Sequence, residues 1–163
     1  MRVMIILASS CLIGKKCAYD GKARTNLKVL KLCSSSYVKC FDICPELIAG
    51  LPCPREKNEI QGGTGREVLE GKAIVISESG QHNTKYFISG AKKVLNMAIK
   101  SGISIALMKS NSPSCSNKKI YSGNFDNTLI NGAGVTASLL MKSGIKVLSE
   151  NEIDEVFELL KKS

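Results

Sequence analysis

Short, continuously apolar segments alternate with amphipathic ones, and this pattern constrains the fold of the chain more than any other feature. Residues 2–8 and 103–108 are apolar almost throughout, and residues 145–148 form a third such run. Apolar residues recur at helical spacing between them, from 84 to 101, and again from 150 to 161. Continuous apolar strands are typical of parallel sheets buried on both faces by helices. The sequence therefore predicts an α/β fold with a mostly parallel, Rossmann-like sheet flanked by helices.

The other expected elements are shorter, and one long connection separates them. Residues 44–65 contain three prolines and several glycines, which predicts a functional loop. No linker or internal repeat interrupts the 163 residues, so we expect a single domain spanning 1–163. The remaining expected elements are a helix over 26–32, strands over 37–43 and 73–77, and a helix over 132–142.

The net positive charge of the chain does not by itself identify a binding partner. The chain carries 23 Lys and Arg against 14 Asp and Glu, for a net charge of +9, which favours anionic partners, nucleic acid among them. The lysines are scattered, however, without a basic block or interleaved aromatic residues. A solvated surface is therefore the favoured interpretation, with nucleic acid kept as a possible partner and the oligomeric state left undetermined.

The apolar N-terminus is better explained as a strand than as a targeting segment. Its apolar core, residues 3–8, is shorter than the roughly 7–15 residues of a signal peptide. No run approaches the roughly 18 apolar residues of a transmembrane helix. We therefore expect a cytoplasmic protein without a membrane partner.

Cysteine usage points to ligands or nucleophiles rather than to a disulfide framework. The number is odd, the expected compartment is reducing, and no C-x-x-C pair occurs, which disfavours structural disulfides, thioredoxin-type pairs and common zinc ribbons. The seven cysteines are Cys11, Cys17, Cys33, Cys40, Cys44, Cys53 and Cys115.

Three of these cysteines directly follow expected strands. Cys11, Cys44 and Cys115 come after the segments 2–8, 37–43 and 103–108, with Cys115 inside the turn Ser-Pro-Ser-Cys. Ligands of open parallel sheets bind outside the carboxyl ends of the strands, so the three loops can bring three thiols together.

The other four cysteines lack this placement. Cys33 and Cys40 are expected to be small core hydrophobes. Cys17 lies in the first loop and Cys53 in the proline-rich loop, so either could be near the site, but neither cysteine begins the turn after a strand.

Spacing alone leaves three interpretations of the converging thiols open. A structural zinc site needs four ligands, and the only histidine, His82, lies in a polar turn. A four-iron cluster held by three thiolates leaves one iron open to act as a Lewis acid. The third interpretation is a set of thiols that binds no metal.

A weaker glycine pattern lies near the C-terminus. Gly132, Gly134 and Ala137 match a loose dinucleotide-binding pattern, but turn-forming residues replace the strand that should precede it. A helix whose N–H groups face a substrate carbonyl or an anion is possible. A helix that only packs against its neighbours is favoured.

Five segments resemble the thiouracil desulfurase family, in the same order along the chain. The resemblance implies an α/β domain that holds a [4Fe–4S] cluster on three cysteines, with one open iron. The segments are SSCLIG (9–14), YDG (19–21), CPELIAGLPCPR (44–55), KSNSPSCS (109–116) and GAGVTASLL (132–140).

Matched by motif, the resemblance assigns the cluster ligands to Cys11, Cys44 and Cys115. It assigns catalytic roles to Glu46 and Ser112. Two departures concern substrate preference: Cys53 stands where the family commonly has threonine, and Ala18 stands where it often has arginine. Asp20 and Arg55 are expected to be solvated loop residues unless they orient ligands.

The chemistry agrees with these residue types. A thiolate-bound iron is a soft acceptor for a thiocarbonyl sulfur. A carboxylate in a dry pocket, here Glu46, can act as general base and then acid, and Ser112 could position substrate or water. Without the resemblance, Glu46 would be taken as an ordinary exposed loop carboxylate.

The resulting expectation is an iron–sulfur desulfurase that acts on a small thiolated heterocycle such as 2-thiouracil. It would release uracil and hydrosulfide by non-redox hydrolysis. The alternative is a cluster- or zinc-binding module that acts on or recognises thiolated RNA, and the net charge of +9 is its support.

Overall fold

A four-stranded parallel sheet forms the centre of the computed structural model, which describes residues 2–163. The first strand pairs in parallel with a neighbour on each side, and Ile6 lies opposite Cys40 in one neighbour and Ile105 in the other. The fourth strand also pairs in parallel, so all four strands run in the same direction and their carboxyl ends share one edge. In spatial order the strands are β2 (Val38–Ile43), β1 (Met4–Ser9), β5 (Ile105–Met108) and β8 (Lys146–Ser149).

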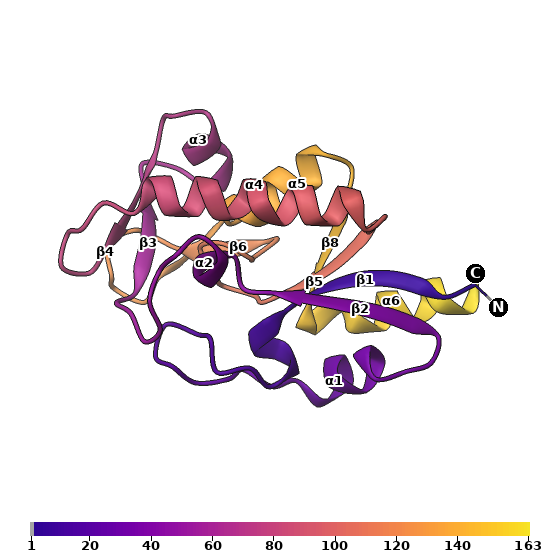
Figure 1. Ribbon diagram of the computed structural model, residues 1–163. Coiled ribbons are helices and arrows are strands. Elements are labelled where there is room, and N and C mark those ends of the chain that lie inside the picture. The colour runs from indigo at the N-terminus through magenta and orange to yellow at the C-terminus, as the bar shows by residue number, and fades with distance from the viewer. Residues whose placement is uncertain (1) are drawn as a thin grey trace.

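Helices cover both faces of this sheet (Figure 1). Ile6 and Leu107 face a core shared with α1 (Leu27–Cys33) and α6 (Ile153–Lys161), and the neighbouring Leu7 faces the opposite core. That second core is shared with α4 (Thr84–Lys100) and α5 (Val135–Lys142). Strands buried on both faces explain the continuous apolar runs in the sequence, and the predicted α/β fold with a parallel sheet is confirmed.

A smaller subassembly packs at the carboxyl edge of the sheet. Its ribbon pairs β3 (Asn58–Gln61) with β4 (Ile74–Ser77) in antiparallel register, and a hairpin pairs β6 (Lys119–Tyr121) with β7 (Leu129–Asn131). Ile60, Val75 and Ile120 form a third core with α3 (Gly65–Leu69) and part of α4.

The strand expected over 73–77 is therefore correct, but it lies outside the parallel sheet. The interpretation of 44–65 as one loop is wrong in part, because this segment contains α2 (Pro45–Ile48) and β3. The helix α2 is a single turn, and β3 has the mostly polar sequence Asn-Glu-Ile-Gln, so neither shows the apolar run that disclosed β4. Two 3-10 turns, η1 (Ser10–Ile13) and η2 (Glu150–Glu152), complete the elements.

Cys33 and Cys40 depart from the expectation of two unpaired core thiols. Cys33 ends α1 and Cys40 lies in β2, both half-buried against the core that α1 shares with the sheet, and a disulfide joins them with their Cα atoms 5.2 Å apart. The chain turns sharply between α1 and β2 and brings the end of the helix beside the strand. This pairing depends on the turn, so the spacing of seven residues did not disclose it.

Among the described helices, none combines the length and the hydrophobicity that crossing a bilayer requires.

A glycine in α4 allows α2 to lie directly on that helix. A side chain at Gly90 would collide with the carbonyl oxygen of Pro45 and press on the Ala49 side chain at 3.2 Å. Because the obstacle is backbone, it cannot move aside as a flexible side chain would. Gly90 therefore fixes how closely the turn after β2 approaches α4.

Gly90→Ala is expected to lower the free energy of unfolding by about 1 kcal/mol. Overpacking costs about 1–3 kcal/mol and outweighs the roughly 1 kcal/mol that alanine gains in a helix. Urea denaturation measures the change as a lower midpoint at an unchanged slope. Lys92→Ala, on the exposed face of the same helix, is the control and should leave stability near that of the wild type. A Gly90→Ala protein as stable as the wild type would contradict this account of the α2–α4 contact.

Candidate functional site

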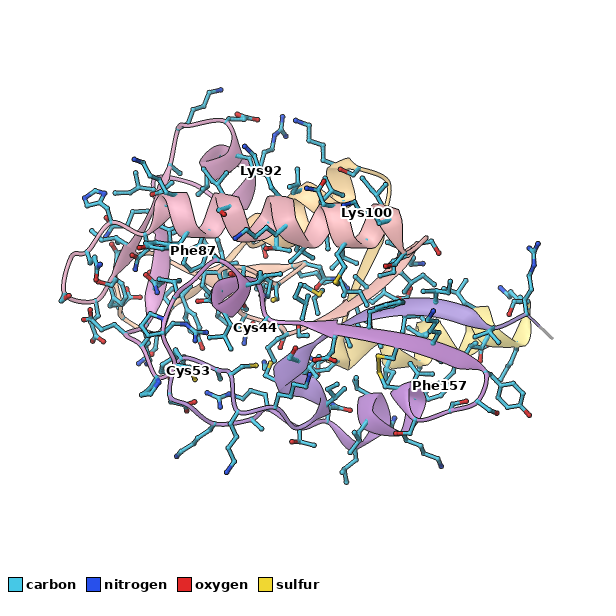
Figure 2. The ribbon with its side chains drawn as sticks, in the orientation of Figure 1. Cys44, Cys53, Phe87, Lys92, Lys100 and Phe157 are labelled. Carbon is cyan, nitrogen blue, oxygen red and sulfur yellow. A yellow bond between two sulfur atoms is a disulfide. The ribbon has the colours of Figure 1, made fainter. Side chains whose placement is uncertain are left out.

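A cavity of about 250 Å³ lies at the carboxyl edge of the parallel sheet. The turns after β1, β2 and β5 contribute Cys11, Cys44 and Cys115 to its lining. The convergence expected from the strand order is therefore present. Figure 2 labels Cys44 beside α2, and Cys53 in the loop that follows that helix.

The first loop places Cys11 within η1, immediately after β1. Its thiol is buried, and its carbonyl accepts a hydrogen bond from the Arg24 amide at 2.8 Å. Asn26 caps α1 through a hydrogen bond from the Val29 amide at 3.1 Å, which ends the loop where the sequence predicted a helix start. These hydrogen bonds fix the loop between β1 and α1, and with it the position of Cys11.

The second loop carries Glu46 two residues after Cys44, in the first turn of α2. The Glu46 side chain is only 12% exposed, so the interpretation as an ordinary exposed carboxylate is wrong. Burial raises its pKa, and the opposing effects of the Arg55 charge and of hydrogen bonds from Arg55 and Ser114 are weaker. Glu46 also lines the cavity.

Arg55 connects two of the loops around this carboxylate. Its Nε donates to Glu46 Oε1 at 3.4 Å, and its terminal nitrogens donate to the carbonyls of Pro52 at 3.2 Å and Cys17 at 3.0 Å. The Arg55 side chain is 5% exposed, so it is not the solvated loop residue that the sequence suggested. Asp20 instead pairs with Arg24 at 2.9 Å in a half-buried ion pair.

The third loop is organised by Ser112. Its hydroxyl oxygen accepts hydrogen bonds from the amides of Ser114 at 3.1 Å and Cys115 at 3.0 Å. Ser112 therefore fixes the backbone of the cysteine turn, a role that sequence reasoning missed, and it also lines the cavity. Burial raises the pKa of Cys115 to about 12, although hydrogen bonds from Ser9 and Ser112 act in the opposite direction.

Helix α5 supports the same turn from behind. Its amides at Val135 and Ala137 donate to the carbonyls of Pro113 at 2.8 Å and Ser114 at 3.0 Å. A side chain at Gly134 would meet the Pro113 carbonyl oxygen at 2.6 Å. At least two of the free N–H groups at the start of this helix therefore bind the cysteine turn.

Cys17 is a fourth buried thiol in the cavity lining, which the sequence did not assign. A hydrogen bond with Cys11 and burial raise its pKa to about 11, and a hydrogen bond with Cys44 acts in the opposite direction. Cys17 is thus a neighbour of two of the three converging thiols. Its position in the middle of a loop gave no sequence signal. Cys53 is exposed and does not line the cavity.

The arrangement disfavours the zinc site considered from the sequence. Among residues 2–163, no group of three His, Cys, Asp or Glu side chains could hold one metal ion. A zinc ion needs its four ligand atoms within about 2–2.3 Å of a single point. In a four-iron cluster each thiolate binds a different iron, so the cysteine sulfurs lie farther apart than the ligands of a single metal ion do. The three converging thiols are soft donors suited to such a cluster.

Comparisons with known proteins identify relatives of this chain. The 2-thiouracil desulfurase family matches residues 6–152. An uncharacterized protein of Bacillus subtilis (strain 168), YbbK, is 43% identical over 152 residues, which are 93% of this chain and 99% of YbbK.

A solved structure has the same fold. It is that of a [4Fe-4S]-dependent thiouracil desulfidase, TudS, which superimposes with a TM-score of 0.87 at 34% sequence identity. The alignment covers 98% of this chain and 99% of TudS. The match over nearly the whole length shows that this chain belongs to the 2-thiouracil desulfurase family.

Proposed function

We propose that this chain removes sulfur from a small thiolated heterocycle, with 2-thiouracil as the leading candidate, and releases uracil and hydrosulfide. The observation that carries the proposal is one cavity lined by three thiols from three strand ends and by the buried carboxylate of Glu46. The family membership and the name of the solved relative support the same substrate.

In this proposal Cys11, Cys44 and Cys115 hold a [4Fe–4S] cluster. The donor set fits, because three soft thiols line the cavity together with Glu46, a proton-transfer group. When bound, the cluster supplies a soft Lewis acid that polarises the C=S bond through an iron without a protein ligand. The raised pKa of Cys115 means that cluster binding displaces a proton from that thiol.

Glu46 acts on the water and on the leaving sulfur. As a general base it removes a proton from the water that attacks the thiocarbonyl carbon, and as an acid it returns that proton. Arg55 orients the carboxylate, because its guanidinium group is itself held by hydrogen bonds to the carbonyls of Pro52 and Cys17. Ser112 holds the Cys115 turn and presents its hydroxyl to the cavity, where it can position the ring or the water.

The overall reaction is a hydrolysis. The thione and water give the carbonyl compound, hydrosulfide and a proton, so the C=S bond breaks and a C=O bond forms without a change in electron count. The reaction therefore needs no electron donor. We infer non-redox chemistry from this balance and from the three-thiol ligand set.

The cations around the cavity favour a small substrate over thiolated RNA. Four Lys and Arg residues line it, and three of them, Arg24, Arg55 and Lys109, are each paired with a carboxylate at 2.9, 3.4 and 3.0 Å. The fourth, Lys57, lies over the Tyr19 ring at 5.5 Å. Phosphate contacts need free cations, and only this one lining cation lacks a carboxylate partner among residues 2–163, so the net charge of +9 is not concentrated here for a nucleic-acid backbone.

Serine replacements test the ligand set. Cys11→Ser, Cys44→Ser and Cys115→Ser should each lose most of the iron bound by the anaerobically reconstituted wild type, because each removes a thiolate from a three-ligand site. Iron and acid-labile sulfide per chain are the measurements. Cys53→Ser, at an exposed thiol outside the cavity, is the control.

Cys17→Ser sharpens this test, because Cys17 is a buried thiol in contact with two of the proposed ligands. We expect it to bind nearly as much iron as the wild type. A Cys17→Ser variant that loses its iron while one of the other three keeps it would show that the ligand set is wrong.

Glu46→Gln tests proton transfer. The amide keeps the shape of the side chain but cannot accept a proton, so turnover should fall by about 10²–10⁴ while iron content stays unchanged. Steady-state desulfuration and iron content measured on the same sample separate the two effects. Glu70→Gln, at a half-exposed carboxylate paired with Arg66, is the matched control. Near-normal turnover in Glu46→Gln would remove Glu46 from the mechanism.

A further inference from the structure

A second buried carboxylate lines the cavity and is not used by the proposed chemistry. Glu59 lies in β3 and is 5% exposed, and it belongs to a wall built by the ribbon and by the segment that connects β6 to β7. Among residues 2–163, no Lys, Arg or His approaches its carboxylate within ion-pair distance. A buried charge without a cation needs hydrogen bonds, so its partners show what this side chain is for.

One oxygen of Glu59 is fully engaged with the protein. Its Oε1 accepts hydrogen bonds from the amides of Gly123 at 2.9 Å and Phe125 at 3.2 Å. Gln61 Nε2 donates to the Gly123 carbonyl at 2.8 Å. A side chain at Gly123 would collide with the Ile60 carbonyl oxygen, so this segment lies directly on β3. These contacts hold the Glu59 side chain in one orientation.

The other oxygen, Oε2, has no hydrogen-bond partner among residues 2–163. In the described chain, two fully buried side-chain atoms lack a hydrogen-bond partner, Asn83 Oδ1 and Thr136 Oγ1. Glu59 Oε2 is not among them. Oε2 is therefore not fully buried, and Glu59 is one of the residues that line the cavity. One acceptor oxygen of this side chain is thus free to take a hydrogen bond from a bound molecule.

We propose that Glu59 Oε2 binds a ring N–H of the substrate, so that the cavity selects thiolated heterocycles with an N–H beside the thiocarbonyl. Such a ring would place its sulfur toward the three thiols and its N–H toward β3. An ionised carboxyl is an acceptor only, so it favours an N–H edge and disfavours a ring nitrogen that carries a lone pair or a methyl group. Glu59 is a specificity residue in this assignment, which rests on the proposed function.

Ring binding can be measured without turnover. Isothermal titration of the anaerobically reconstituted protein with uracil, 1-methyluracil and 3-methyluracil reports the contact directly, because these rings have no sulfur to react. The wild type should bind at least one methyl isomer tenfold or more weakly than uracil, since methylation removes the donor that Oε2 needs. Equal binding of all three rings, or no binding of uracil, would overturn the proposal.

Glu59→Gln is the sharper test. Its amide oxygen can still accept from Gly123 and Phe125, while its NH₂ group replaces the acceptor that faces the cavity. Uracil should bind about ten- to hundredfold more weakly, and the difference between uracil and the methyl isomers should disappear. Unchanged affinity with unchanged discrimination would contradict the assignment.

Two further variants separate recognition from structure. Glu56→Gln, three residues earlier, removes an exposed carboxylate that accepts from Ser79 and does not line the cavity, and it should bind uracil as the wild type does. Gly123→Ala displaces the supporting segment while keeping the carboxylate. It should weaken uracil binding and reduce the discrimination between the rings, because Glu59 loses the contacts that orient it. Unchanged binding and discrimination in Gly123→Ala would contradict the role of this segment in orienting Glu59.

The two proposals can fail separately. In the same variants, KM for 2-thiouracil should rise with a much smaller change in kcat, because a contact made equally in the ground state and the transition state affects binding alone. A wild type that binds uracil with the expected discrimination but releases no hydrosulfide would refute the proposed function and leave the role of Glu59 supported.

Discussion

The parallel pairing of β1 with β2 and β5 is the constraint on which the site depends. Ile6 lies opposite Cys40 and Ile105, so three strands end at one edge and three turns leave from it. Each turn delivers one cysteine to the same cavity, although the cysteines are far apart in the sequence. The strands themselves are held by burial on both faces, which makes the apolar core the foundation of the thiol arrangement.

Hydrogen bonds from other parts of the chain hold the turns in place. Arg55 connects the loops after β1 and β2 by hydrogen bonds, and the amides at the start of α5 hydrogen-bond to the turn after β5. Gly90 lets α2 approach α4 closely enough for Glu46 to lie at the cavity. A soft-donor site beside a buried carboxylate is thus built into the fold, which is what a hydrolysis assisted by a soft metal requires.

Much of this could be predicted from the sequence, and the omissions have physical causes. Cys11, Cys44 and Cys115 were identifiable because each follows a segment whose pattern predicts a strand, two of them continuous apolar runs and one an alternating segment. The partners of Glu46 and Glu59 were not, because they depend on long-range packing of polar residues, which leaves no periodic pattern. Cys17 lies within an irregular loop, and the short strands β3, β6 and β7 carry too few residues to show alternation.

The central claim is that this three-thiol cavity supports non-redox removal of sulfur from a thiolated ring. The most direct measurement is an anaerobic assay of the reconstituted protein with 2-thiouracil and no electron donor, in which uracil and hydrosulfide are quantified together. The account predicts equal release of both over many turnovers, loss of activity after exposure to air, and recovery on anaerobic reconstitution. Strict dependence on an electron donor, or uracil formation without matching hydrosulfide, would contradict it.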